Sequence, residues 1–443
     1  MRPHGVSTGE VELMGPRRLS TPRFGWIGVM AATVVLFAVA GFALAQDPVT
    51  IRFTWWGNPD RDARTNQMVE LFMEAHPWIT VVTEPTVFDG YFDKLATSTA
   101  AGDAPDVITM GGTYPTEYGA AGQLLDLTTV PDAVGLNNYD PAAYSSATLD
   151  GAVYGLPTGG NARGLLINLD LFEQAGVPVP NDSTWTWEEF VDIAGQLSAN
   201  LPDGVYGVDW RLDIKEEFAA QRGPEMFLPG GGIGVTAETM ADLFQIPLDL
   251  LANGGMPSAE ETVELINTQA ERTYFGQAKA AMMFGYSNNV QEFADRLGQR
   301  VNIIKIPGEA QYASPGLQVL PSQYFTIYAR SANPEAAAML VDWLLNEPEA
   351  AKIILGNRGL SFNPAIAEVI SPFLGEFEAQ SAQYLARVAN EGRAALFVPT
   401  SGKGEVDDLT NLLHEQVLFG LTSPLEAGEE YVERSSRIIP GPQ

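Results

Sequence analysis

Strand-like and helix-like segments alternate along most of this 443-residue chain. The run IRFTWWG (51–57) predicts a strand that ends in two tryptophans and a turn, and a segment with helical periodicity follows as far as Pro77. ITVVTEP predicts a second strand, YFDKLATSTAAG a helix, and DVITM (106–110) a third strand. This β-α-β-α-β order is typical of an α/β fold, in which helices cover parallel sheets and ligands bind at the carboxyl ends of the strands.

The second half of the chain continues in the same style. Thr186-Trp187-Glu188-Glu189 has the pattern of a capping box and predicts a helix start, and PEAAAMLVDWLLNEPEAAKIILGN predicts two amphipathic helices that are split near Pro348. No internal repeat or Pro/Ser-rich linker separates two independent halves. We therefore expect one continuous α/β architecture.

Residues 1–45 have the pattern of an export signal. Arg17, Arg18 and Arg23 precede an apolar run over 27–44, and Ala43-Leu44-Ala45 is the small-x-small pattern that signal peptidase recognises before Gln46. The alternative is a retained membrane anchor, because the apolar run is close to the minimum length of a span. The sequence predicts a periplasmic, secreted or cell-surface bacterial protein.

Charge and cysteine content narrow the function classes. The formal charge of the chain is −30, and without the four Arg and two Glu of residues 1–45 the remainder carries −32. Such a surface repels phosphate backbones, so we expect no nucleic-acid partner. The chain contains no cysteine, which excludes disulfides, thiolate metal sites and a lipid-modified Cys.

The stretch YGLPTGGNARGLLIN (154–168) places small and polar residues between two apolar segments that are too short for helices. Gly159 and Gly160 permit backbone angles and close approaches that side chains would forbid. We expect a strand that crosses between two lobes, with this pair at the crossing. A β-bulge or a hairpin turn inside one domain is the alternative.

Four motifs, in order, resemble those of one family. These are AGDAPDVITMGG, the stretch GAVYGLPTGGNARGLLINLDLFEQAGV followed by TWTWEEF, FGQAKAAMMFGYSNN and GLSFNPA. The chain resembles the extracellular solute-binding proteins of ATP-driven importers, in the carbohydrate-binding group that includes maltose-binding protein. The resemblance extends over almost all of residues 49–436.

The resemblance implies a two-lobe periplasmic-binding-protein fold of type II, in which each lobe is a mostly parallel sheet flanked by helices. It implies an N-lobe of residues 46–158 and 320–365 and a C-lobe of residues 159–319 and 366–443, with Gly159 and Gly160 at the hinge. It also implies a monomer that closes on a sugar and delivers it to a membrane permease. The binding protein itself needs no cofactor, because a separate subunit would hydrolyse ATP.

The candidate ligand residues combine aromatic platforms for sugar rings with polar groups for hydroxyls. Trp55 and Trp56 alternate faces of a strand, so we expect Trp55 in the core and Trp56 in the cleft. Tyr286 is the best single candidate for a stacking platform. The full candidate set is Trp56, Asn58, Asp60, Thr113, Tyr114, Asn161, Trp210, Tyr286, Gln323, Tyr324 and Arg358.

Some of these candidates have structural alternatives. Asn58 and Asp60 are also turn formers, Trp210 is also suited to a packed surface position, and Arg358 to capping a helix end. Asn161 and Tyr286 stand where some relatives have a carboxylate and a tryptophan, and the lipid-attachment Cys of many relatives is absent. These differences leave the identity of the sugar open.

The sequence predicts a binding protein without enzymatic activity. After residue 45 only His76 and His414 remain, and without cysteine they argue against a zinc site or a histidine-based catalytic centre. A secreted glycoside hydrolase that uses two carboxylates is the main alternative. A sugar-sensing or adhesion protein without a transport role is another.

Overall fold

A computed structural model describes residues 47–223, 225–228, 230–265, 272–312, 314–392 and 402–441. The predicted export signal lies outside the described residues. Among the described residues, no helix is both long enough and apolar enough to cross a membrane.

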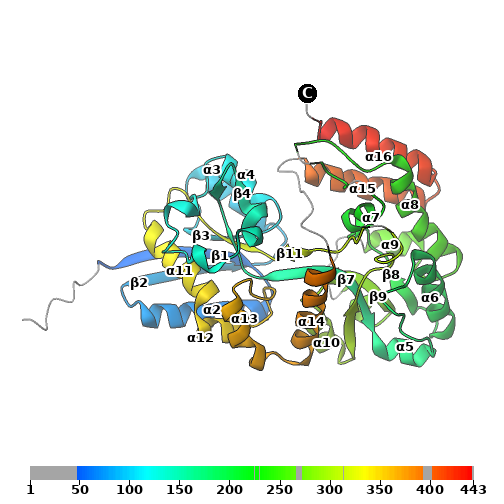
Figure 1. Cartoon of the computed structure of the whole chain (residues 1–443), viewed down its shortest axis with the longest axis horizontal. Coiled ribbons are helices and arrows are strands. Elements are labelled where there is room, and N and C mark those ends of the chain that lie inside the picture. Colours follow the sequence, from blue (N-terminus) through cyan, green and yellow to red (C-terminus); the bar gives the residue numbers. More distant parts are fainter. Residues whose placement is uncertain are drawn as a thin grey trace, which may run out of the picture. The chain divides into compact units, whose positions relative to one another are not determined.

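The first lobe is built on a five-stranded sheet of order β2-β1-β3-β12-β6. Its strands are β1 (Val49–Trp56), β2 (Ile79–Thr86), β3 (Val107–Met110), β6 (Leu156–Pro157) and β12 (Tyr324–Ile327). Its main helices are α2 (Pro59–Ala75), α3 (Tyr91–Ala101), α4 (Tyr114–Ala120), α11 (Pro334–Asn346), α12 (Pro348–Ile354) and α13 (Pro364–Ile370). Helices α2 and α12 lie on one side of this sheet, and α3 and α4 on the other (Figure 1).

The second lobe is built on a sheet of order β10-β7-β9-β8, with β11 also paired to β7. Its strands are β7 (Gly160–Asn168), β8 (Tyr206–Asp209), β9 (Ala280–Tyr286), β10 (Val301–Ile304) and β11 (Val319–Pro321). Its helices are α5 (Leu169–Ala175), α6 (Trp187–Asn200), α7 (Lys215–Gln221), α8 (Ala237–Ala252), α9 (Ala259–Glu264), α10 (Asn289–Leu297), α14 (Glu376–Glu391), α15 (Lys403–Leu418) and α16 (Pro424–Ile438).

Short elements complete the first lobe. They are the 3-10 helices η1 (Leu127–Thr129), η2 (Leu136–Asn138) and η3 (Pro141–Ala147) and the two-stranded sheet of β4 (Thr148–Leu149) and β5 (Ala152–Val153). Two further 3-10 turns are η5 (Phe275–Gln277) and η6 (Ser371–Phe373). The exact lobe boundaries expected from the sequence stay a prediction.

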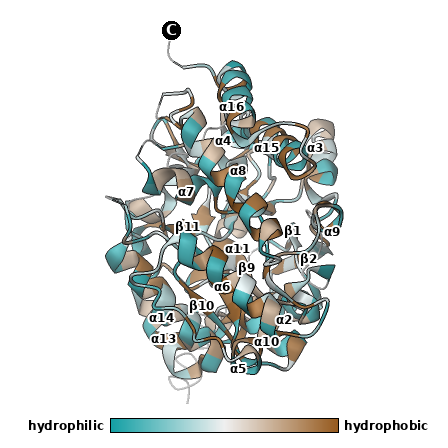
Figure 2. Cartoon of the chain, turned by 90° about the vertical axis from the view of Figure 1, so that its right-hand side faces the viewer, coloured by the Kyte–Doolittle hydropathy of each residue, from teal (hydrophilic) through white to brown (hydrophobic). Residues whose placement is uncertain are grey.

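Each lobe has its own hydrophobic core. In the first lobe, Phe53 and Trp55 of β1 are fully buried with Phe72 of α2. Trp56 points to the other face of the sheet, as the alternation of strand side chains requires. In the second lobe, hydrophobic residues concentrate on β9 and β10, whereas the outer helices mix both kinds (Figure 2).

The expected two-lobe α/β fold, with two sheets flanked by helices, is confirmed. The strand directions differ from the mostly parallel arrangement expected for each sheet. In the first sheet, β12 is antiparallel to β3 and β6, and in the second sheet only the β8–β9 pair is parallel among the described strands. The physical reason is that β7 and β12 enter their sheets directly from a crossing segment, without the helical crossover that makes neighbouring strands parallel.

His414 gives the second lobe a built-in sensitivity to acid. Its ring on α15 is 2% exposed, and its Nε2 atom has no hydrogen-bond partner among the described residues. Burial lowers the pKa of His414 to about 4, because the positive form loses hydration there. The folded state therefore holds fewer protons than the unfolded state, and stability is lost as the pH falls from about 6.5 towards 4.

We predict that replacing His414 with Leu removes this component of acid sensitivity. In the native protein the His414 component lowers the free energy of unfolding by about 2–3 kcal/mol between pH 7.5 and 4.5. Urea unfolding of both proteins at pH 7.5 and 4.5 gives the change in the free energy of unfolding between the two pH values. The difference in this change between the native protein and His414→Leu measures the His414 component. Equal slopes for the native protein and His414→Leu would contradict the prediction.

Candidate functional site

The start of helix α2 brings polar side chains to the carboxyl end of β1. Asn58 is the N-cap, and its side chain accepts a hydrogen bond from the Arg61 backbone at 3.0 Å, while Pro59 occupies the first turn. This cap explains why the helix begins directly after the strand. Asp60, Arg61 and Arg64 then lie on the first two turns, beside Asn58.

Three chain segments meet beside this helix end. Gly160 exchanges backbone hydrogen bonds with Leu360 at 2.6 and 3.1 Å, and the Ser322 N–H donates to the Gly159 carbonyl at 2.8 Å. A Cβ atom on Gly159 would lie 2.5 Å from the Gly359 carbonyl carbon. The glycine therefore permits a backbone contact that any side chain would obstruct. That these glycines act as a hinge stays a prediction.

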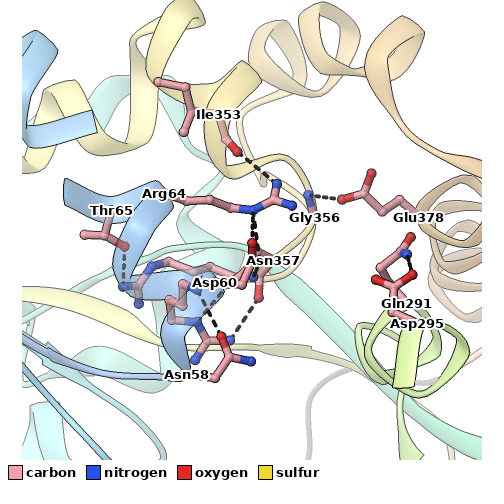
Figure 3. Close-up of polar contacts among 12 residues, drawn as sticks. Asn58, Asp60, Arg64, Thr65, Gln291, Asp295, Ile353, Gly356, Asn357 and Glu378 are labelled. Atoms are coloured by element: carbon pink, nitrogen blue, oxygen red, sulfur yellow. Dashed lines mark hydrogen bonds and ion pairs between the residues drawn. The ribbon is translucent and has the colours of Figure 1, made fainter. Parts of the chain in front are cut away.

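A polar cavity of about 650 Å³ lies between the two lobes. Its walls come from three helices, α2, α10 and α14, and from three connecting segments: the first crossing at residues 159–161, the segment after β9 and the segment after α12. Figure 3 shows part of this lining. The lining residues are Asn58, Asp60, Arg61, Arg64, Asn161, Ser287, Asn288, Gln291, Glu292, Asp295, Arg296, Gly356, Asn357, Gly359, Leu360, Glu378 and Ser381.

Asn161 is the most distinctive residue of this cavity. It is 6% exposed, and its Oδ1 atom has no hydrogen-bond partner in the described part of the chain. Leaving a buried polar oxygen unsatisfied costs free energy on the order of 1–3 kcal/mol. A bound molecule with a hydrogen-bond donor would remove that cost.

Several charged groups of the cavity are held by partners on their own side. Arg64 donates to both oxygens of Asp60 at 3.1 and 3.0 Å, and Arg61 donates to the Asn357 side-chain oxygen at 2.8 Å. Burial lowers the pKa of Arg61. On the opposite side, Gln291 donates to Asp295 at 2.8 Å (Figure 3). These contacts fix the side chains before any molecule enters.

An aromatic cluster lies at the carboxyl edge of the first sheet. The Trp56 ring is 5.0–5.7 Å from the rings of Phe88, Tyr91 and Phe92, and Tyr114 stacks on Phe92 at 3.8 Å. Phe88 is 57% exposed, so part of this cluster faces solvent. The structure thus brings the candidates Trp56 and Tyr114 together, and Thr113 beside them donates to the Glu117 carboxylate.

Tyr286 of β9 contacts Arg163 of β7. The Arg163 guanidinium lies 4.7 Å from the centre of the Tyr286 ring and 3.2 Å from the Glu217 carboxylate. Burial raises the pKa of Glu217 to about 7, although the Arg163 charge acts in the opposite direction. One face of Tyr286 is therefore occupied by a cation from its own lobe.

Trp56, Thr113, Tyr114 and Tyr286 lie outside the cavity lining, and so do the four remaining candidates. Trp210 is 2% exposed and packs in the second core against Phe190 and Phe284. Tyr324 is buried and bonds to Ser146. Gln323 accepts a hydrogen bond from Arg358, whose pKa is lowered well below its usual value by burial.

Of the residues predicted from the sequence, Asn58, Asp60 and Asn161 line the cavity, and the other lining residues were not predicted. Gln291 and Glu292 follow the SNN part of the FGYSNN motif by one helical turn, so the motif itself was a signal for them. Asn357 is the neighbour of the candidate Arg358. No comparable signal pointed to Glu378, because α14 reaches the cavity through tertiary packing alone. The described residues contain no group of three or more His, Asp or Glu arranged to hold a metal ion.

Comparisons with known proteins place this arrangement in a family context. The family model described as "Bacterial extracellular solute-binding protein" matches residues 56–351. An uncharacterized lipoprotein from the oleD 5' region of Streptomyces antibioticus is 27% identical over 74% of this chain and 74% of its own length. The mannitol-binding protein of Pseudomonas aeruginosa is 31% identical over 37% of each chain.

A similar solved structure is the periplasmic oligogalacturonide-binding protein of Yersinia enterocolitica in complex with saturated digalacturonic acid. It has a TM-score of 0.76 and 20% identity, and the match covers 88% of this chain and 98% of the other. This likeness shows the fold, which is the two-lobe type II arrangement of periplasmic binding proteins.

We predict that Gly159→Ala destabilises the crossing. The new methyl group meets Gly359 backbone atoms that cannot rotate away, so we expect a loss of about 1–3 kcal/mol in the free energy of unfolding, measured in urea. Gly404→Ala in helix α15 is the control, since nothing lies within 4 Å of its added Cβ, and it should leave the free energy of unfolding unchanged or raise it by up to about 1 kcal/mol. Equal stabilities of the two variants would show that the crossing tolerates a side chain.

Proposed function

Because this chain belongs to the bacterial extracellular solute-binding protein family, we propose that it is the extracytoplasmic binding protein of an ABC importer and captures a mono- or oligosaccharide between its lobes. In this proposal the loaded protein delivers the sugar to membrane permease subunits, which a separate ATP-hydrolysing subunit drives. The chain acts as an exported monomer without a cofactor and catalyses no reaction.

The observation that carries the proposal is the unpartnered oxygen of Asn161 in a cavity with walls from both lobes. A sugar hydroxyl is a donor of the right kind for this oxygen. Asn58, Asn288 and Gln291 supply further amide groups, which can both donate and accept and do not titrate. Such groups suit a ligand that presents many neutral hydroxyls.

The aromatic cluster supplies the other half of sugar recognition. The apolar face of a pyranose ring packs on aromatic side chains, and the partly exposed Phe88 and the half-buried Trp56 and Tyr114 offer such a surface. We propose Trp56, Thr113 and Tyr114 as contacts of the first lobe, and Asn161 and Tyr286 as contacts of the second.

The other candidates have different proposed parts. Asn58 and Asp60 contact the sugar from the start of α2. Gln323 and Arg358 act on it indirectly, because they are buried beneath the crossing. Trp210 and Tyr324 are buried in positions that serve packing. Similar proteins agree with a polyol or sugar ligand, since they include a mannitol-binding and an oligogalacturonide-binding protein.

Closure follows from binding to both lobes. A ligand that contacts both walls binds the closed form more tightly than the open form, so it shifts the population toward closure. The crossing at Gly159 and Gly160 is where a change in backbone angles would be absorbed. The closed form is then the one that docks on the permease.

We predict that one class of sugar stabilises residues 46–443 after any bound ligand has been removed by mild unfolding. A thermal-shift screen against mono- and oligosaccharides and polyols is the measurement, and each hit is recovered for chromatography. A sugar at 100 times its Kd adds about 2.7 kcal/mol to the free energy of unfolding. Fragments in place of the intact sugar would establish a glycoside hydrolase, and a panel without any shift would contradict the proposal.

Asn161→Leu tests the site itself. This change removes the acceptor for the sugar hydroxyl, so we expect affinity for the identified sugar to fall by about tenfold or more, measured by calorimetry. Asn137→Leu, at an exposed asparagine of η2, is the control and should keep native affinity. Native affinity in Asn161→Leu would place the sugar elsewhere.

A further inference from the structure

The two walls of the cavity differ in net charge. Helix α2 contributes Arg61 and Arg64, one helical turn apart, together with Asp60, and helix α10 contributes Glu292 and Asp295 at the same spacing, together with Arg296. Residues three apart share one face of a helix, so each pair points to the same side. The two helices belong to different lobes, and Figure 3 shows Arg64 and Asp295 on opposite sides of the space between them.

Arg61 has bonding capacity left in this conformation. Its Nε and Nη2 atoms donate to Asn357 at 2.8 and 3.0 Å, and no hydrogen bond from Nη1 is present in the described residues. Glu292 accepts one hydrogen bond there, a long one of 3.4 Å from Asn289. Neither side chain forms an ion pair with the other lobe among the described residues.

The two groups already influence each other. Burial lowers the pKa of Arg61, and the strongest effect in the opposite direction comes from the Glu292 carboxylate, ahead of Asp62 and Asp60 on the same helix as Arg61. The carboxylate on the opposite wall therefore favours the charged form of this guanidinium, as do the two acidic neighbours on its own helix. Narrowing of the cavity would shorten the separation and strengthen the attraction.

One contact already joins α14 of the second lobe to the segment after α12. Glu378 accepts a hydrogen bond from the Gly356 N–H at 3.3 Å and another from the Gly375 N–H at 3.1 Å, at the start of its own helix. Gly356 is next to Asn357, the residue that holds Arg61. The Glu378 contact therefore keeps the α2 side of the cavity close to α14 before closure.

We propose that Arg61 and Glu292 form an ion pair across the cavity in the closed form, and that this closing pair positions the walls around the captured sugar. The inference rests on the proposed function, because it assigns the pair to the closure that captures the sugar. Arg61 and Glu292 are positioning residues: they act by holding the lobes together, and the amide groups beside them contact the sugar.

The test uses the absence of cysteine from the chain and needs no sugar. Arg64→Cys and Gln291→Cys place one thiol on each wall, and a short bismaleimide traps the closed form when the walls approach. Mass spectrometry follows the rate of cross-linking in four versions of this double-cysteine protein. They keep both native residues at 61 and 292, carry Arg61→Glu, carry Glu292→Arg, or carry both changes. Circular dichroism and thermal unfolding establish that each variant is folded.

We expect each single reversal to slow trapping by about fivefold or more, because it places like charges on facing walls. The exchange of both charges should restore the native rate to within about twofold. The difference should shrink in 0.5 M salt, where the screening length is only a few ångströms. Glu292→Gln, a milder change, should slow trapping less than Glu292→Arg.

Lys94→Cys with Gln291→Cys is the control pair, since α3 covers the other face of the first sheet (Figure 1). Equal rates in all four backgrounds, an exchange as slow as the single reversals, or trapping no faster than in the control pair would each overturn the closing pair. If the four backgrounds are trapped at equal rates while the sugar screen finds a ligand, only the closing pair is contradicted. If the rates depend on charge as expected while the screen finds no ligand, only the proposal of a sugar ligand is contradicted.

Discussion

The rest of the structure depends on a close approach of three backbone segments at Gly159 and Gly160. The first crossing, at Gly159 and Gly160, is bonded to Ser322 of the second crossing, which runs between β11 and β12, and to Leu360 of the segment between α12 and α13. Gly359 lies so near Gly159 that no side chain fits between them. Each of these segments continues into a strand or helix of one of the two lobes. Their junction therefore constrains the position of the two sheets relative to each other. The junction also bears on the cavity, because Asn161, the next residue along the first crossing, is one of its lining residues.

A buried guanidinium reinforces the same junction. Arg358 bonds to Gln323 of the second crossing and to Thr65 of α2, and its carbonyl accepts a hydrogen bond from Thr158 of the first crossing. These contacts tie the start of α2 to all three segments. The position of Asn58 and Asp60 in the cavity therefore depends on Arg358, although Arg358 does not line it. Arg358 was predicted from the sequence as a ligand residue. Because its side chain is buried, its hydrogen bonds go to other residues of the protein.

Local patterns predicted most of the fold, and tertiary contacts decided what they missed. The alternation of strand and helix periods located the first lobe, and the alternation within β1 correctly assigned Trp55 to the core. The directions of β7 and β12 could not follow from period alone, because both strands enter their sheets from crossings. At the site, Asn58, Asp60 and Asn161 came from turn and crossing motifs. Trp210 shows the limit of such motifs, since a tryptophan at the end of a strand fits a core as well as a cleft.

The electrostatics of the cavity can be reconciled with a chain of net charge −32 after residue 45. Several charged groups of the lining are held by a local partner, since Arg64 bonds to Asp60, Arg61 to Asn357 and Asp295 to Gln291. A hydroxyl that enters need not break any of these contacts to reach the free oxygen of Asn161. An anionic ligand that bound Arg64 would have to compete with the Asp60 carboxylate that this arginine already holds, and it would also lose hydration on entering the cavity. The same pairing suits the neutral hydroxyls of the proposed ligand, and in the proposed closure it leaves Arg61 able to reach Glu292.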